Sequence, residues 1–337
     1  MYTYDNVGNR TQLIYPDNKQ VYYSYDGDNR LTTVLDWRGS TTSYDYDTVG
    51  RLITTTLPSS ITTRVYDAAN RLLSIMHKGT KSGFEEMKPF AYYQYELDNV
   101  GNRIGVSETL QGHSTDIRYG YDALYRLTNA RYGGNITAEY EYYYDAVGNM
   151  IAHNETTGKE TINITRSYNA ANQLQTAMEA MAGTSSYYYD GNGNMVQVLP
   201  PGVNVGGEGE KLYDFNQRNL LIHHEETLGI FLGYPGFVDY VYDGNGDRVQ
   251  QVVRETGYTP IITTTYTNDP LGLTQVLLAD NGTTQTAQLY GLDLIGQDDI
   301  GQDNKEKAMR LLLTDGLGSV RQEMAGGVVQ TTTTYGP

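Results

Sequence analysis

The acidic and amide side chains of two short runs are the groups in this sequence best suited to bind a metal ion. Asp190-Gly191-Asn192-Gly193-Asn194 and Asp243-Gly244-Asn245-Gly246-Asp247 place oxygen atoms at alternate positions, as a calcium-binding loop does. Both runs lack the glycine of such a loop's sixth position, and the twelfth position holds Pro201 or Arg254 instead of a bidentate Glu. We therefore predict that the first Asp of each run caps a turn. We expect no cofactor, and calcium is the alternative.

No arrangement in the sequence is typical of a catalytic centre. The five histidines are His77, His113, His153, His223 and His224. Neighbouring side chains of a strand point to opposite faces, so the adjacent pair cannot bind one metal from one side, and no zinc-ligand spacing occurs. Lys78–Gly83 contains a Lys-Ser pair but not the spacing of a phosphate-binding loop, and there is no Gly-x-Ser-x-Gly elbow. We predict that the chain is not an enzyme and has no catalytic, cofactor-binding or metal-binding residue.

A repeated turn motif organises the chain. Tyr4-Asp5-Asn6-Val7-Gly8-Asn9-Arg10 opens the sequence, and related segments begin every 20 to 31 residues, which gives thirteen units. Such a period is typical of one supersecondary unit stacked on copies of itself. Looser copies begin at Tyr168-Asn169, Tyr213-Asp214, Tyr266 and Tyr290. The residues that we expect to form structural turns are Tyr4, Asp5, Gly8, Arg10, Tyr25, Asp26, Arg30, Tyr46, Asp47, Gly50, Arg51, Tyr66, Asp67, Arg71, Asp98, Gly101, Arg103, Tyr121, Asp122, Arg126, Tyr144, Asp145, Gly148, Tyr189, Asp190, Gly193, Tyr242, Asp243, Gly246 and Arg248.

Each unit is predicted to be a β-hairpin. A Tyr- or Thr-rich run such as Val21-Tyr22-Tyr23-Ser24-Tyr25 precedes the Asp, and these residue types favour a pleated, half-buried surface. Asp, Gly and Asn then supply the tight turn, and a second short strand follows. The long interval from His77 to Ala91 is interpreted as a polar insertion. Only Gln173 to Met181 and Asp303 to Arg310 are candidates for short helices.

The repeated Arg and Tyr side chains also admit a binding interpretation. A column of Arg could form a basic stripe, but the adjacent Asp column favours an Asp–Arg ladder, with Arg over Tyr rings. The Tyr columns could bind sugars, although packing within the sheet explains 32 Tyr against 5 Phe and 1 Trp equally directly.

Composition excludes several classes of protein. The net charge is −16, which argues against a nucleic-acid partner and suits a basic guest. The sequence has no apolar run long enough to span a membrane. It has no cysteine, so disulfides do not stabilise it. We expect residues 1–337 to form one continuous array that continues beyond both ends, because neither end has the polar cap that a repeat array requires. The terminal strands would otherwise pair with copies of the chain and form a filament.

The repeat resembles that of the RHS/YD-repeat family along essentially the whole chain. Two C-terminal segments within residues 290–337 sharpen the resemblance to the start of the family's conserved core. They are Tyr290-Gly291-Leu292-Asp293-Leu294-Ile295-Gly296-Gln297 and Asp315-Gly316-Leu317-Gly318-Ser319-Val320-Arg321. The matching core positions are Tyr290, Gly291, Asp293, Gly296, Asp315, Gly318, Ser319 and Arg321.

The resemblance implies an all-β fold in which tandem hairpins form a curved or spiralling antiparallel sheet, either a partial hollow shell or a solenoid-like fibre. Bacterial members of the family are secreted or surface-displayed polymorphic toxins whose shell encloses a C-terminal toxin. Many carry an Asp-based self-cleavage motif after the core. Asp269-Pro270-Leu271-Gly272-Leu273 resembles that motif but precedes the core segments, so we interpret it as an ordinary repeat turn.

The leading hypothesis is a non-enzymatic structural segment of an extracellular or cell-surface protein, acting as shell, stalk or fibre wall. Its partners would be flanking parts of a longer chain, copies of itself, or an enclosed toxin. The alternatives are an adhesin that binds glycans or a protein through exposed Tyr and Thr, a self-cleaving shell whose protease motif lies beyond Pro337, and an extracellular filament subunit.

Overall fold

The computed structural model describes residues 1–80, 89–134, 137–227, 236–254, 260–270, 274–301 and 308–335. These residues form 29 strands of one sheet. The strands are β1 (Tyr2–Tyr4), β2 (Arg10–Ile14), β3 (Gln20–Tyr25), β4 (Leu31–Leu35), β5 (Thr41–Tyr46), β6 (Leu52–Thr56), β7 (Ser60–Tyr66), β8 (Leu72–Gly79), β9 (Pro89–Leu97), β10 (Arg103–Leu110), β11 (His113–Tyr121), β12 (Leu127–Gly134), β13 (Ala138–Tyr144), β14 (Met150–Thr157), β15 (Glu160–Tyr168), β16 (Leu174–Glu179), β17 (Gly183–Tyr189), β18 (Met195–Leu199), β19 (Lys211–Phe215), β20 (Leu221–Glu226), β21 (Gly236–Tyr242), β22 (Arg248–Arg254), β23 (Pro260–Asp269), β24 (Gln275–Asp280), β25 (Thr284–Tyr290), β26 (Leu294–Gly301), β27 (Arg310–Thr314), β28 (Val320–Ala325) and β29 (Val328–Thr332).

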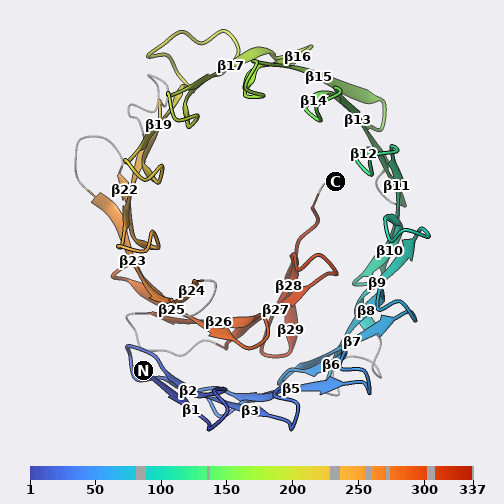
Figure 1. The fold of residues 1–337 in the computed structure, drawn as a ribbon, viewed down its shortest axis with the longest axis vertical. Helices are drawn as coiled ribbons and strands as arrows, with labels where there is room; N and C mark the ends of the chain where they lie inside the picture. Colours follow the sequence, from blue (N-terminus) through green and yellow to red (C-terminus); the bar gives the residue numbers. More distant parts are fainter. Residues whose placement is uncertain are drawn as a thin grey trace. The chain divides into compact units, whose positions relative to one another are not determined.

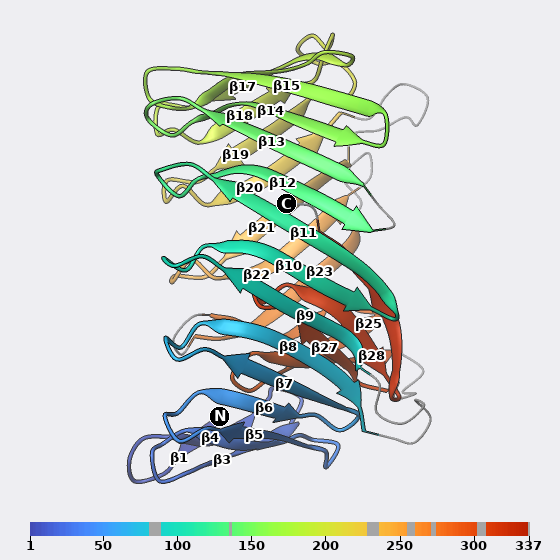
Figure 2. The ribbon, with the colours of Figure 1, turned by 90° about the vertical axis from the view of Figure 1, so that its right-hand side faces the viewer.

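The prediction of an all-β antiparallel fold is confirmed. Each strand ladder joins consecutive strands, for example β3 with β4 and β9 with β10, and Figure 2 shows such hairpins lying side by side. No described helix is long and apolar enough to cross a membrane. The array of residues 1–337 separates into two compact units. Unit 1 comprises residues 1–125, 131–137 and 286–337, and unit 2 comprises residues 126–130 and 138–285.

Three local predictions require correction. The predicted helix Gln173 to Met181 is wrong, because Leu174–Glu179 forms β16 and pairs with β15 and β17. Tyr213-Asp214 does not start a turn, since both residues lie within β19. The polar insertion is shorter than predicted, because β8 continues through His77 to Gly79 and β9 begins at Pro89.

Some predicted features lie wholly or partly outside the described residues. They are the centre of the insertion at 81–88, which includes the adjacent Lys-Ser pair, positions 271–273 of the Asp-Pro segment, and 303–307 of the second predicted helix. The last residue of that predicted helix, Arg310, begins β27 instead. Asp269, the last residue of β23, is described and is buried.

The repeated Asp shapes each turn through its own side chain. Oδ1 of Asp47 accepts hydrogen bonds from the backbone N–H groups of Val49 (3.0 Å) and Arg51 (2.9 Å). These bonds explain why the pKa of Asp47 is lowered, with the Arg51 backbone bond as the largest cause. The same pair of acceptor contacts recurs at Asp5, Asp26, Asp67, Asp98, Asp145, Asp190 and Asp243.

The residue three positions after the Asp requires a left-handed backbone. Gly50 has φ +88°, and Asn29 and Asn70 occupy the equivalent place with φ +61° and +62°. Gly and Asn tolerate this conformation better than other residues. In the turn after β19 the Asp position is taken by Asn216, whose Oδ1 accepts from Arg218 N (2.9 Å) and Leu220 N (3.1 Å). An amide oxygen therefore substitutes for the carboxylate. The turn of this unit begins at Asn216, two residues after the predicted Asp214.

The tyrosine of the motif joins most repeats to the one before. The hydroxyl of Tyr25 donates to the carbonyl oxygen of Arg10 (3.0 Å), and that of Tyr168 donates to Met150 O (2.9 Å). The same bond is made by Tyr46, Tyr66, Tyr121, Tyr144 and Tyr242 to the first strand residue after the preceding turn. A Phe at this position would pack but could not make the bond, which accounts for the preference for Tyr at this position.

Where the motif contains an arginine, this residue can join its repeat to the next. Arg51 pairs with Asp47 of its own turn (2.6 Å), lies 5.3 Å from the Tyr66 ring, and donates to Asp67 O (2.9 Å). Arg30 pairs with Asp26 and stacks 4.8 Å from the ring of Tyr46. These contacts hold the guanidinium groups at the turns, so the groups do not form a basic binding surface.

The two units differ in how far one face of the sheet is buried. Tyrosines two residues before the motif Tyr point to this face. Tyr23, Tyr44 and Tyr95 in unit 1 are at most 7% exposed, whereas Tyr142 and Tyr187 in unit 2 are half-buried. The additional burial in unit 1 comes from the last strands of the chain.

We predict that Tyr168→Phe destabilises unit 2 by about 0.5–1.5 kcal/mol, because it removes one intramolecular hydrogen bond. The measurement is the urea midpoint by circular dichroism. Tyr188→Phe is the matched control, since Tyr188 is 46% exposed and is not a motif Tyr. Equal midpoints for both variants would contradict a role for the inter-repeat hydroxyl.

Candidate functional site at the seam of unit 1

The last strands of the chain pack against the first strands within unit 1. Figures 1 and 2 show β27 and β28 beside β7–β9. Five hydrogen-bonded contacts, between residues more than 200 positions apart, define what we call the seam. They are Tyr15 Oη to Gln288 O (2.6 Å), Trp37 Nε1 to Asp298 Oδ2 (2.7 Å), His77 Nε2 to Thr314 O (3.0 Å), Gly316 N to Tyr95 Oη (2.7 Å) and Arg321 Nη2 to Glu108 Oε2 (2.9 Å).

Arg321 is the most heavily bonded residue of the seam. It is 7% exposed and forms ion pairs with Glu108 (2.9 Å) and Asp315 (3.2 Å). Its Nε donates to Thr333 O (2.8 Å), and its guanidinium lies 5.4 Å from the Tyr93 ring. Loss of one partner from a buried ion pair leaves an uncompensated charge and costs about 3–5 kcal/mol. Arg321 therefore holds β28 against β10.

Asp298 joins β26 to the turn between β4 and β5. The residue is 1% exposed, and Oδ2 accepts from Trp37 Nε1 (2.7 Å) and Arg38 Nε (3.1 Å). That turn is closed by Asp36, whose Oδ1 accepts from Arg38 N and Ser40 N at 2.8 Å. Burial raises the pKa of Asp36. The only tryptophan of the chain thus lies at the seam.

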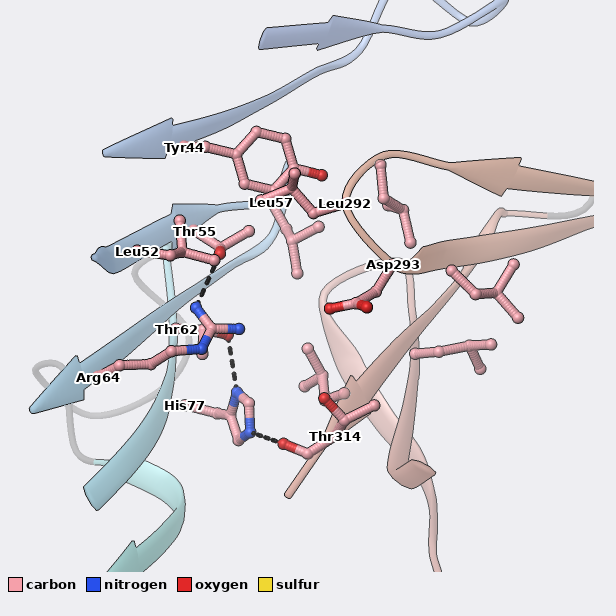
Figure 3. A pocket seen from close by; sticks show the side chains of 14 residues that line it. Tyr44, Leu52, Thr55, Leu57, Thr62, Arg64, His77, Leu292, Asp293 and Thr314 are labelled. Atoms are coloured by element: carbon pink, nitrogen blue, oxygen red, sulfur yellow. Dashed lines mark hydrogen bonds between the residues drawn. The ribbon is translucent and has the colours of Figure 1, made fainter. Parts of the chain in front are cut away.

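His77 bridges β7 and β27 at the edge of a cavity of about 50 Å³, shown in Figure 3. The carbonyl oxygen of Thr314 only accepts, so Nε2 carries the proton, and Nδ1 accepts from Thr62 Oγ1 (2.8 Å). Burial lowers the pKa of His77 to about 4, so the ring is neutral near pH 7. The cavity has the volume of about two waters at about 30 Å³ each, too small for a substrate.

Arg64 and Asp293 face this cavity from opposite sides in Figure 3. Nη1 of Arg64 donates to Thr55 Oγ1 (3.0 Å), and burial lowers the pKa of Arg64. Burial also raises the pKa of Tyr44, whose ring lies at the upper rim. Groups of this kind can exchange protons, but the space between them admits only water. The arrangement is therefore suited to holding strands together.

Two glycines of the predicted core segments are required by close approach. A Cβ atom at Gly291 would collide with the Tyr44 hydroxyl, and one at Gly296 would lie 2.5 Å from the carbonyl oxygen of Arg310. Asp315 caps the turn before β28, because Oδ1 accepts from Leu317 N (2.8 Å) and Ser319 N (3.2 Å).

The other predicted core residues make only local contacts, within their own turns and strands. Gly318 supplies the left-handed residue of the Asp315 turn with φ +81°. The hydroxyl of Tyr290 donates to Gln288 Oε1 (2.6 Å), and the carbonyl oxygen of Asp293 accepts from Gly291 N (2.9 Å). The structure therefore brings Asp315 and Arg321 together, and it places Tyr290, Gly291 and Asp293 in a separate turn.

Sequence reasoning missed the N-terminal half of the seam. Trp37, His77, Tyr95 and Glu108 were not predicted to have a role, and only the uniqueness of Trp37 marked any of them. Within the part of the chain that the structure describes, no group of three or more His, Asp or Glu side chains could hold a metal ion.

Comparison with known proteins gives one family. Residues 91–333 match the family model described as the teneurin YD-shell, and residues 25–62 and 46–80 match the RHS repeat model. The chain is 34% identical over 139 residues to tRNA nuclease WapA of Bacillus subtilis (strain 168), which covers 40% of this chain and 5% of that protein.

Solved structures share the fold at low sequence identity. The crystal structure of TcdB2-TccC3-TEV has a TM-score of 0.62 at 16% identity, covering 99% of this chain and 20% of that one. The Tc holotoxin pore of Photorhabdus luminescens has a TM-score of 0.60 at 16% identity, covering 95% and 18%. The chain thus spans about a fifth of the solved chains and a twentieth of the curated relative.

The seam should weaken in mild acid. The folded-state pKa of His77 is lowered to about 4, so between about pH 6.5 and pH 4 the unfolded chain binds the proton that the folded chain excludes, and stability falls as pH falls. We predict a loss of about 2 kcal/mol between about pH 7.5 and pH 5 from this residue. The measurement is urea unfolding followed by Trp37 fluorescence.

His77→Gln should remove this part of the pH dependence. His113→Gln, at an exposed histidine of the same unit, should retain it. An unchanged pH dependence in His77→Gln would show that the buried imidazole does not govern the acid response.

Proposed function

Because the chain belongs to the YD-shell family of RHS-repeat proteins, we propose that it is a length of shell wall within a longer polypeptide. The wall is structural and non-enzymatic. It encloses a segment of the same polypeptide, and in a toxin-bearing member of the family that segment is the toxin. The proposed location is extracellular or at the cell surface, in keeping with the names of the Tc toxin relatives.

The seam is the observation that carries this proposal. A stalk or fibre needs only neighbour-to-neighbour contacts between repeats. Unit 1 instead joins its last strands to its first through side chains that are almost fully buried, including Asp298 at 1% and Arg321 at 7% exposure. Contacts that join distant strands of one wall resist opening, which is the property an enclosing wall requires.

The uncovered face of unit 2 supports the same proposal. Tyr142 and Tyr187 are half-buried there, whereas Tyr44 and Tyr95 of unit 1 are buried by β25–β28. A half-buried face with Tyr hydroxyls can contact an enclosed polypeptide without forming a tight core.

The test uses the longer polypeptide in which this chain lies, including the segment that follows Pro337. We predict that the following segment resists protease while the wall is intact, and that electron microscopy of the same sample shows hollow bodies. Arg321→Met should make digestion of that segment at least about ten-fold faster, because breaking a buried ion pair costs about 3–5 kcal/mol.

Arg118→Met is the matched control, since the Arg118 side chain is 59% exposed in its pair with Glu96, and its removal should not change the digestion rate. Extended fibres, or a following segment that is digested at once in the unaltered protein, would contradict enclosure. Binding to a glycan array and self-assembly through strand edges stay predictions, as does self-cleavage beyond Pro337.

A further inference from the structure

A second cavity of about 250 Å³ lies in unit 1 where β9–β11 meet the turn before β28. At about 30 Å³ per water it has room for on the order of eight waters, the size of a small ring molecule and not of a single ion. It lies beside exposed Leu317 (75%) and Tyr335 (52%), so a ligand could enter from solvent. Tyr93, Tyr95, Arg103, Glu108, Asp315 and Arg321 supply its polar lining.

The charges around this cavity cancel. Arg321 is paired with Glu108 and Asp315, and Arg103 supplies the second positive charge that balances these two carboxylates. A charged ligand would therefore add a net charge to a lining whose own charges sum to zero, and burying an unbalanced charge is costly.

Three of the tyrosine rings that line the cavity already face a guanidinium group. The Arg103 guanidinium lies 4.2 Å from the Tyr95 ring centroid, and that of Arg321 lies 5.4 Å from Tyr93 and 5.9 Å from Tyr335. Cation–π attraction is thus satisfied within the chain. A lysine side chain or a quaternary ammonium would have to compete with these guanidinium groups for the three rings.

Unused hydrogen-bonding groups remain in the cavity. Tyr93 is fully buried, and its hydroxyl has no hydrogen-bond partner among the described residues. Burying an unpaired hydroxyl costs about 1–3 kcal/mol, so such a group in a cavity indicates a missing polar partner. Arg103 adds guanidinium donors that face the cavity and whose charge is engaged by Tyr95.

We propose that this cavity binds a single neutral sugar ring. Sugar hydroxyls both donate and accept, so one can pair with Tyr93 Oη and others with Arg103 and the outer oxygens of Glu108 and Asp315. The apolar face of the sugar ring can lie against the Tyr119 side chain, which also lines the cavity, as is usual in pockets with a few placed polar groups. This site is a cavity within unit 1, so it differs from the exposed Tyr and Thr surfaces of the sheet, and it does not depend on the shell function.

The test is calorimetric titration of the purified chain with glucose, galactose, mannose and N-acetylglucosamine, together with a glycan array. We expect at least one neutral sugar to bind at one site with Kd of about 1 mM or lower. Tyr93→Phe should weaken binding about ten-fold, because the ligand loses a buried hydrogen bond. Arg103→Gln should weaken it independently. Binding of free sugars indicates a soluble ligand, and binding only on the array indicates the terminal residue of a glycan.

Matched controls decide between this site and nonspecific binding. Tyr92→Phe alters the neighbouring tyrosine of β9, whose side chain points to the opposite face, and should leave Kd unchanged. Glucuronate and glucosamine carry one charge on the same ring and should bind at least about ten-fold more weakly than glucose. The proposal is overturned if no neutral sugar binds in either format, if Tyr92→Phe weakens binding as much as Tyr93→Phe, or if a charged analogue binds more tightly.

Discussion

The hydrogen bond that most motif tyrosines donate to the backbone of the preceding repeat is the interaction on which the rest of the fold depends. A sheet built from hairpins has ladder bonds between its strands, but side chains must fix how successive turns align. Tyr46 reaches back to Leu31 O, and Arg51 reaches forward to Asp67 O. The Asp side chain shapes the turn between them. Where the motif has both Tyr and Arg, the repeat is therefore tied to its neighbours on both sides.

The seam adds contacts between distant parts of the chain, which the repeat does not make. Contacts within the repeat extend only to adjacent units, so they set no limit on how many units follow. Trp37–Asp298 and Glu108–Arg321 join strands that are more than 200 residues apart. Tyr44 and Tyr95 of unit 1 are buried where Gly291 and Gly316 of the C-terminal segment approach their side chains, whereas Tyr142 and Tyr187 of unit 2 are half-buried. Burial in this chain is thus governed by the seam as well as by the local pattern.

The sequence was sufficient to predict the local structure and the family, since Tyr-rich runs, Asp-Gly turns and a regular period each have a local physical cause. It was not sufficient for Gln173–Met181, where pairing with β15 and β17 overrides a weak helical pattern. Nor could it place Asn216 in the Asp role, because Asn makes the same turn bonds. The seam could not be predicted from the sequence, because nothing near Glu108 or His77 indicates a partner in the last strands.

A double-mutant cycle between Glu108 and Arg321 tests the seam most directly. Glu108→Gln and Arg321→Met, alone and together, would be compared by urea unfolding with Trp37 as the probe of unit 1. A buried ion pair in contact predicts a coupling energy of at least about 1.5 kcal/mol, above the range of about 0–1 kcal/mol for exposed pairs such as Arg118–Glu96. A coupling energy indistinguishable from zero would show that the last strands do not rest against β10 and would contradict the seam.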